Sequence, residues 1–206
     1  MELESIIIDN VPVAHVSEVI RVEKEAWPEE LRAPEDKFRQ RLEKFPHGFF
    51  GIYVNGVLAG TLTSMRTNKT PQEDLKWDEV TGNGYVSTHE ANGAWLYVVS
   101  LGVSEKYSGK GLGASLIGKA TEFAKSLGCE GLFLQARPCE YDTYCKANGD
   151  LPIGEYLKLR RLDGQHIDKE IRFYEKSGLK IVKPVEDGEI DAASRNYTVT
   201  MQFLAK

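Results

Sequence analysis

The chain has 206 residues, of which 41% are hydrophobic and 28% are charged, and its formal net charge is −5. This composition is typical of a soluble globular protein with one domain and a sizeable core. The acidic balance argues against a nucleic-acid partner. No apolar run approaches the ~20 residues that a membrane-spanning helix needs, so we expect no membrane partner.

Cysteine content and the start of the chain bear on the compartment. The three cysteines, Cys129, Cys139 and Cys145, are an odd and sparse set that predicts reduced thiols rather than a disulfide framework. Cys139 and Cys145 also lack the C-x-x-C spacing of a zinc site, and we expect no metal. The start, MELESIIID, is acidic and has no signal-peptide pattern. Together these features predict a cytoplasmic protein.

Periodicity and turn residues predict the elements of the first half of the chain. In order, these are a strand at 5–8, a helix at 16–27, a helix between Pro34 and Pro46, and strands at 48–54 and 57–65. The first helix ends at Pro28, because proline disfavours helical conformation in the residue before it. The two later strands are joined by Asn55-Gly56, a strong two-residue hairpin signal.

The second half predicts alternating strands and helices. In order, these are a strand that begins with Trp95–Val99, a helix at 112–127 followed by Gly128, a strand at 131–136, a helix at 168–177, and strands at 180–185 and 196–204. The run Trp95–Val99 is rich in β-branched and aromatic residues, which favours a strand. Gly128 stands where a C-cap glycine belongs.

Two long polar insertions interrupt this order, at about 67–92 and 137–166. Part of the second, at 153–161, is predicted to be helical. Long loops in compact domains are often functional, and the first insertion offers candidates to line a substrate site: Trp77, Tyr85, His89 and Glu90. The alternative is a solvent-exposed loop whose aromatic residues anchor it to the core.

The chain is organised around a glycine-dense turn, Ser108-Gly109-Lys110-Gly111-Leu112-Gly113, between the strand at Trp95 and the following helix. Glycines let a ligand approach the backbone closely. The first turn of a helix also presents unpaired N–H groups and the positive end of the helix dipole. The turn therefore predicts an anion site, and the anion that we expect there is a phosphate.

The spacing of the glycines in the turn distinguishes between the known kinds of phosphate-binding motif. A P-loop needs G-x-x-x-x-G-K-[ST], but Gly111 follows Lys110 and the upstream glycine is missing. A dinucleotide site needs G-x-G-x-x-G behind an early strand, which this turn does not provide. An ordinary glycine-rich turn remains an alternative on this stretch alone. The stretch resembles the acyl-CoA motif of the GNAT superfamily of N-acetyltransferases, [RQ]-x-x-G-x-[GA], with Ser108 where that family usually has Arg or Gln.

A second stretch strengthens the resemblance. Phe173–Leu179 is similar to the Y-E-K-x-G-[FL] signature at the end of the last helix of GNAT proteins. Ile167 stands where the family often has Asn. The order of predicted elements also matches the GNAT order over nearly the whole chain. The resemblance therefore implies one GNAT-like domain over 1–206, an α/β fold of the α+β type with a mixed, mostly antiparallel central sheet flanked by helices.

The resemblance implies transfer of an acetyl or other acyl group from acetyl-CoA, as co-substrate, to an amine of a small molecule or a peptide. The residues that it assigns to the cofactor are Leu101, Gly102, Val103, Ser108, Gly109, Lys110, Gly111, Leu112, Gly113 and Ala114. Tyr174 matches the family's usual general acid, and a phenol carries its proton at neutral pH. The alternative is a packed helical tyrosine.

The general base is open. His89 and Glu90 precede the central strand, Tyr141 follows the next one, and a mechanism without a single protein base is the fourth possibility. We expect the two insertions to form an enlarged acceptor pocket or a lid. A homodimer that pairs through the final strand or the insertions is possible. The alternative to an enzyme is an acyl-CoA-binding or sensing module of the same fold.

Overall fold

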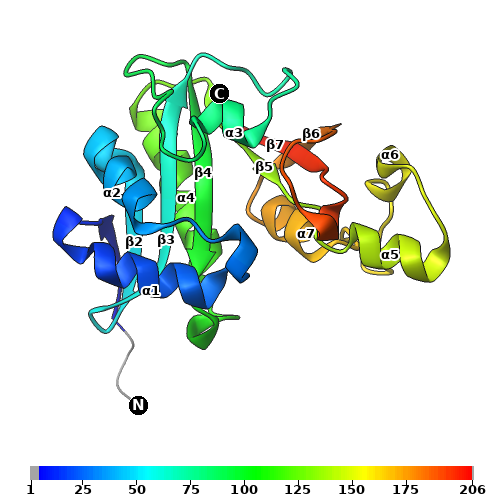
Figure 1. Ribbon diagram of the computed structural model, residues 1–206, viewed down its shortest axis with the longest axis horizontal. Helices are drawn as coiled ribbons and strands as arrows, with labels where there is room; N and C mark the ends of the chain where they lie inside the picture. The colour runs from blue at the N-terminus through cyan, green and yellow to red at the C-terminus, as the bar shows by residue number, and fades with distance from the viewer. Residues whose placement is uncertain (1–4, 206) are drawn as a thin grey trace.

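A computed structural model describes residues 5–205; residues 1–4 of the acidic start, and Lys206, lie outside the described part. Within it the chain forms a seven-stranded sheet (Figure 1). The strands are β1 (Ile6–Asn10), β2 (Phe49–Val54), β3 (Val57–Thr67), β4 (Trp95–Val103), β5 (Gly131–Ala136), β6 (Lys180–Val185) and β7 (Thr198–Leu204). Their order in the sheet is β1-β2-β3-β4-β5-β7-β6, and β4–β5 is the one parallel pair of neighbours. This confirms the expected mixed, mostly antiparallel sheet.

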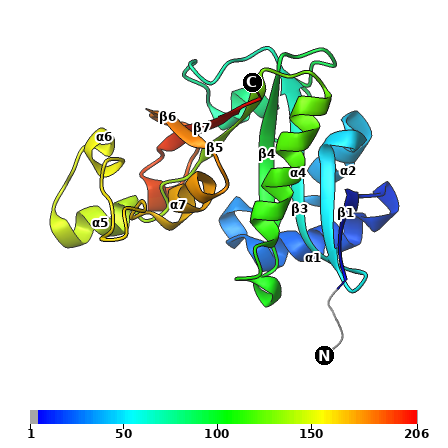
Figure 2. The ribbon, with the colours of Figure 1, turned by 180° about the vertical axis from the view of Figure 1, so that it is seen from behind.

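Helices cover both faces of the sheet. They are α1 (Val16–Ala26), α2 (Glu35–Lys44), α3 (Trp77–Thr81), α4 (Leu112–Ser126), α5 (Tyr141–Asn148), α6 (Ile153–Tyr156) and α7 (Lys169–Lys176). Figure 1 shows α1 and α2 in front of β2–β4, and the reverse view in Figure 2 shows α4 across the other face. Each face has a buried core, because the helices turn apolar stripes towards the sheet. No helix in residues 5–205 is long and apolar enough to cross a membrane.

The two insertions carry more helix than the sequence predicts. The first contains α3, and the second contains α5, whose buried Tyr141 and Cys145 lie one turn apart. Conversely, the helix predicted at 153–161 is shorter in the structure: α6 ends at Tyr156, since the chain then turns back through a bridge between Arg160 and His166. Short polar helices have weak sequence patterns because packing, not propensity, holds them.

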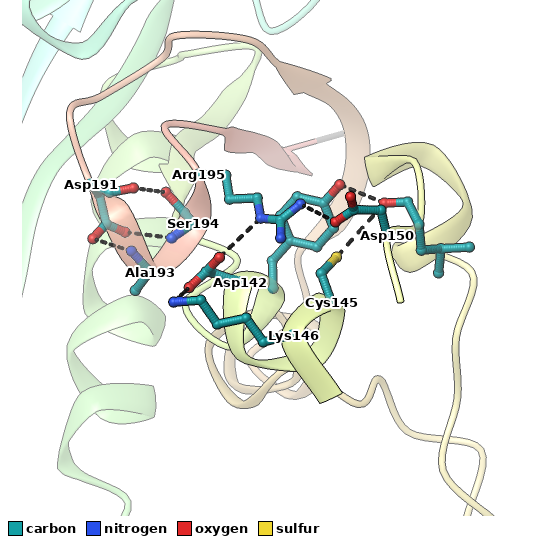
Figure 3. A network of polar contacts seen from close by, with 10 residues as sticks. Asp142, Cys145, Lys146, Asp150, Asp191, Ala193, Ser194 and Arg195 are labelled. Carbon is teal, nitrogen blue, oxygen red and sulfur yellow. Dashed lines mark hydrogen bonds and ion pairs between the residues drawn. The ribbon is translucent and has the colours of Figure 1, made fainter. Parts of the chain in front are cut away.

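Residues 141–165, which we name the arm, project beyond β6 and β7 at one side of the molecule (Figures 1 and 2). Figure 3 shows how the arm is attached: the Arg195 guanidinium contacts Asp142 through Nε at 3.0 Å and Asp150 through Nη1 at 2.8 Å. Within the arm, the Tyr141 hydroxyl donates to the carbonyl of Leu151 at 2.6 Å.

The strands β4 and β5 separate halfway along the sheet. They pair only where Trp95–Tyr97 lies beside Gly131–Phe133, and beyond that point they diverge. A β-bulge bends β4 there, because its register with β3 shifts between Val98 and Ser100. The bulged residue is Val99, and its carbonyl accepts a hydrogen bond from the Trp77 indole at 3.0 Å. The divergence opens the centre of the sheet at the end of β4.

The final strand does not offer an edge for a dimer. β7 is paired with β5 on one side and β6 on the other, so its backbone groups are already used. Only β1 and β6 lie at the edges of the described sheet.

Candidate functional site

A cavity of about 1200 Å³ lies where β4 ends, between the start of α4 and the face of α7. We name it the large cavity. Its lining includes nine of the residues predicted for the site: Leu101, Val103, Ser108, Gly109, Gly111, Leu112, Gly113, Ala114 and Tyr174. Gly102 and Lys110 are not among the lining residues, and the Lys110 ammonium lies over the Tyr107 ring, 5.8 Å from its centroid.

The end of β4 turns backbone groups into this cavity. The Ser104 N–H donates to Ala59 on β3 at 2.8 Å. Because successive residues of a strand point their backbone groups to opposite sides, Gly102 also faces β3, whereas Leu101 and Val103 face the side on which β5 has moved away. These two residues can therefore pair with an extended ligand lying along β4.

The glycines of the turn have two different roles. Gly109 and Gly111 have φ values of +77° and +75°, a conformation that favours glycine, and nothing lies within 4 Å of the position of a Cβ at either. Gly111 is the N-cap of α4, where no side chain caps the first-turn N–H groups. Gly113 is needed for packing instead, since a Cβ there would lie 3.1 Å from the Phe173 ring.

Cations collect around the large cavity although the chain is acidic overall. Its lining holds six basic residues and three acidic ones. The basic residues are Lys24, Arg32, Lys106, Arg137, Lys169 and Lys176. Together with the open N-terminus of α4, they make the cavity suitable for a polyanion such as a pyrophosphate.

Tyr174 lies on α7 at the inner end of the large cavity. Burial, and then the neighbouring Glu170 carboxylate, raise the pKa of its phenol, so it keeps its proton at neutral pH. α7 is fixed at its start by Asp168, whose carboxylate accepts from the N–H groups of Glu170 and Ile171 and from the Tyr156 hydroxyl. Asp168 is fully buried and fully engaged, and neither it nor Ile167 lines the cavity.

A second cavity, of about 230 Å³, lies on the other side of the divergence. Trp77 and Asp78 from the first insertion line it, as do Arg41 and Glu189. The arm contributes no lining residue to either cavity within the described chain. The two cavities share Trp27, Arg32, Leu101, Arg137, Glu170 and Tyr174, and these residues mark their junction.

Carboxylates surround one arginine at this junction. The backbone N–H of Arg137 donates to Glu170 Oε1 at 2.9 Å, and its guanidinium Nε contacts Asp191 at 3.0 Å. Burial raises the pKa of Glu170 to about 7 and that of Glu189 to about 6, in each case partly offset by Arg137. On the opposite wall Arg41 is only 2% exposed and donates to the Ser100 hydroxyl at 3.1 Å.

The three residues predicted as general bases lie away from the junction. His89 stacks on Phe45, 4.3 Å between ring centroids, and its Nδ1 accepts from the Arg66 N–H at 3.1 Å. Burial lowers the pKa of His89. Glu90 accepts from the Asn68 N–H at 2.6 Å. Tyr141 belongs to the arm, and none of the three lines either cavity.

Position along β4 explains the distance of His89 and Glu90. Arg66 pairs with Leu96 at the start of β4, whereas β4 and β5 diverge beyond Tyr97 and the two cavities meet at Leu101. At about 3.3 Å per residue, the five residue steps from Leu96 to Leu101 correspond to about 16 Å. His89 and Glu90 are close to the central strand in the sequence, but they lie at the end of it that is far from the two cavities.

Sequence reasoning did not select Glu170, Arg137, Glu189 or Arg41. A signal existed for Glu170, since it precedes Tyr174 by one helical turn and therefore lies on the same face of the predicted helix. The other three come from separate elements, and only the fold brings them together.

Comparison with known proteins agrees with the geometry. The model of the acetyltransferase (GNAT) family matches residues 16–143, which is more than half of the chain. The uncharacterized N-acetyltransferase YkwB of Bacillus subtilis (strain 168) is 26% identical over 207 residues, covering 98% of this chain and 90% of YkwB.

Solved structures share the fold over almost the full length. The loading GNATL domain of CurA from Lyngbya majuscula matches with a TM-score of 0.85 at 18% identity, covering 98% of both chains. The GphF GNAT-like decarboxylase, solved in complex with isobutyryl-CoA, matches with a TM-score of 0.84 at 20% identity, covering 97% of this chain and 100% of GphF. The chain therefore belongs to the acetyltransferase (GNAT) family.

Proposed function

We propose that acetyl-CoA lies in the large cavity and that an amine of a small molecule or a peptide attacks its thioester from the second cavity. The observation that carries this proposal is the meeting of the two cavities at Tyr174. A ligand in each would place a donor and an acceptor on opposite sides of one junction. Such an arrangement favours direct transfer, because it brings the reacting groups together without a covalent enzyme intermediate.

The donor is held mainly by backbone groups in this proposal. Leu101 and Val103 pair with the pantetheine arm, and the turn from Ser108 to Ala114 holds the pyrophosphate. Support comes from the direction of the β4 backbone and from the uncapped N-terminus of α4. Ser108 in place of Arg or Gln is compatible with this, since the glycine turn binds through N–H groups.

Tyr174 acts as the general acid in this mechanism. When the amine nitrogen bonds to the carbonyl carbon and the C–S bond breaks, the sulfur leaves as a thiolate and takes the Tyr174 proton. The raised pKa of the phenol supports this role, because the hydroxyl stays protonated until the thiolate forms. His89, Glu90 and Tyr141 take no part in this proposed mechanism, since they line neither cavity.

Calorimetric titration with acetyl-CoA tests the donor site, with free CoA and NAD as comparisons. Gly111→Val puts a branched side chain at the N-cap of α4 and should weaken acetyl-CoA binding at least ~10-fold, because it blocks the N–H groups and strains a positive φ. Gly118→Val, in the exposed middle of α4, is the matched control. Wild-type protein that binds NAD but not acetyl-CoA would overturn the assignment.

A second candidate activity is decarboxylation of a carboxyacyl-CoA before transfer. Arg41 favours it, because this buried guanidinium lines the second cavity and has no carboxylate within ion-pair distance among residues 5–205; the Glu23 carboxylate in the same cavity acts on it only from further away. A carboxylate beyond the thioester would contact the guanidinium directly. CO₂ would leave as its C–C bond breaks, and the α-carbon of the resulting enolate would take a proton. Mass spectrometry of malonyl-CoA incubated with the enzyme decides: conversion to acetyl-CoA supports this activity, and unchanged malonyl-CoA excludes it.

A further inference from the structure

Helix α2 presents two cations to the second cavity. Lys37 and Arg41 are four residues apart on α2, so their side chains lie on one face of the helix, and both line the cavity. Neither has a carboxylate within ion-pair distance among residues 5–205. Arg39 lies on the exposed face of the same helix and is paired with Glu35, with Nε and Oε1 at 2.8 Å. The cations of α2 without an ion pair in the described chain are therefore those that line the cavity.

The Arg41 guanidinium is held in place, but its donors are not all used. It is only 2% exposed, and its carbon lies 4.8 Å from the centroid of the Phe38 ring. Its Nε donates to the Gly84 carbonyl at 2.6 Å, and its Nη1 donates to the Ser100 hydroxyl at 3.1 Å. A guanidinium has five N–H donors, and those that remain have no hydrogen-bond partner within residues 5–205. Buried charged donors without partners are costly, so this arrangement favours an anionic ligand.

The acidic residues of the cavity do not supply the missing partner. Glu23 acts on Arg41 only from beyond ion-pair distance, and its Oε1 already accepts from the Ala33 N–H at 2.8 Å. Arg137, not Arg41, is the arginine that acts on the two acids nearest the junction. The acidic lining residues other than Glu23 are Glu30, Asp78, Glu170 and Glu189. They disfavour a second negative charge on the ligand, so a carboxylate suits the cavity better than a phosphate dianion.

The free donors of Arg41 lie close to the junction of the two cavities. Ser100, which accepts from Arg41, directly precedes Leu101 on β4, and Leu101 lines both cavities. Ser100 Oγ also shares a hydrogen bond with Thr63 Oγ1 at 2.7 Å. If Thr63 is the donor in that bond, the Ser100 proton is available to a ligand. An anion bound to Arg41 would therefore belong to a substrate that reaches the junction.

We propose that Arg41 and Lys37 form a carboxylate subsite of the second cavity, and that the substrate lying there carries a carboxylate. This inference rests on the proposed function, because it takes the junction as the place of acyl transfer. A carboxylate matches the planar guanidinium and accepts two parallel hydrogen bonds from it, whereas Lys37 acts as a point charge. The carboxylate has two possible sources, the far end of a dicarboxylic acyl group on CoA or the acyl acceptor. The subsite concerns recognition and does not depend on loss of CO₂.

Two thioethers of CoA test the first source: S-(2-carboxyethyl)-CoA and S-(2-carbamoylethyl)-CoA. They are almost equal in size and differ in the charge that each places beyond the sulfur. If the carboxylate belongs to the acyl group, the wild-type protein should bind the carboxyethyl compound at least about tenfold more tightly in a calorimetric titration at neutral pH.

Propanoate and propanamide test the second source. The protein is first saturated with S-methyl-CoA, which occupies the donor site and adds only a methyl group beyond the sulfur. If the carboxylate belongs to the acceptor, propanoate should bind at least about tenfold more tightly than propanamide in a ligand-observed NMR titration at fixed ionic strength. The two thioethers should then bind with nearly equal affinity.

Matched variants assign the preference to its residues. Arg41→Gln should abolish the preference for the carboxylate while S-methyl-CoA binds within about twofold of wild type, which also shows that the variant is folded. Arg41→Lys keeps the charge but not the paired donors and should retain only part of the preference. Lys37→Gln should reduce the preference severalfold. Arg39→Gln removes a cation from the exposed face of α2 and should change nothing.

The outcomes separate this inference from the proposed function. If neither pair of compounds shows a preference for the carboxylate, or the preference persists in Arg41→Gln, the inference is overturned and the donor site stands. If Arg41→Gln does not fold, Lys37→Gln decides, and an unchanged preference there overturns the inference. If S-methyl-CoA does not bind the wild-type protein, the proposed function fails. The comparison of propanoate with propanamide on the free protein and its variants then decides the carboxylate subsite alone.

Discussion

Replacing Glu170 by Gln should stabilise the protein, and it should do so more strongly at high pH. Burial raises the pKa of this carboxyl from its ordinary 4.5 to about 7, so the folded protein binds the proton more tightly than the unfolded chain does. The folded state therefore loses stability as pH rises from 4.5 to 7, and the loss is complete above pH 7. Gln carries no charge and removes this penalty.

The size of the effect follows from the two proton affinities. A change in pKa from 4.5 to about 7 corresponds to roughly 3 kcal/mol at pH 8, at 1.36 kcal/mol per tenfold change in affinity. At pH 5 the folded carboxyl is already protonated and the remaining penalty is about 1 kcal/mol. Because Glu170 lines a cavity that water enters, we expect the measured gain at pH 8 to be about 2 kcal/mol.

Urea denaturation of the free protein at pH 5, 6, 7 and 8 measures this directly. The gain of Glu170→Gln over wild type should grow steadily across the series, and at pH 8 the melting temperature should rise by about 4–8 °C. Glu175→Gln serves as control and should show a small, constant difference. A gain that is the same at pH 5 and pH 8, or a variant less stable than wild type throughout, would refute the raised pKa on which the argument depends.

Three further outcomes are expected. Tyr174→Phe should reduce acyl transfer on the order of 10²-fold in a thiol-release assay and leave acetyl-CoA affinity within about twofold; unchanged turnover would exclude the acid role. Arg137→Gln should destabilise the protein by about 3 kcal/mol in urea denaturation, because it leaves Asp191 buried without its partner, whereas an unchanged midpoint would show that the pair contributes nothing. Because Glu170 lines both cavities at their junction, loss of its proton should change kcat/KM with an apparent pKa near 7, and this change should be absent in Glu170→Gln; a limb that persists in the variant would belong to another group.

Local sequence patterns were sufficient for most of the fold. The Asn55-Gly56 hairpin, the prolines that end α1 and α2, and the glycine turn before α4 are signals that act within a few residues. The strand β4 and the helix α7 carry strong periodic patterns, and both are where they were expected. The short helices α3 and α5 were not predicted, because tertiary packing rather than local sequence stabilises them.

The candidate site divides in the same way. The glycine turn and Tyr174 were predictable, since each belongs to one contiguous stretch. The charged cluster was not predictable, because Arg137, Glu170 and Glu189 lie on three different segments of the chain. Arg137 and Glu170 are more than thirty residues apart in the sequence, and only the fold brings them together. His89 and Glu90 were selected for their position beside β4 in the sequence, but the register of β3 and β4 puts them at the end of the strand that remains paired.

The divergence of β4 and β5 has a consequence for the empty protein. It creates two unpaired strand edges in the interior of the sheet, where an ordinary sheet has none. Exposed edges are the places where sheets recruit foreign strands and aggregate. A bound pantetheine arm would protect the β4 edge, and the amide hydrogens of Leu101 and Val103 should then exchange with deuterated water more slowly. The backbone groups of β4 that can bind the donor are thus also the groups through which an unliganded chain could pair with other chains.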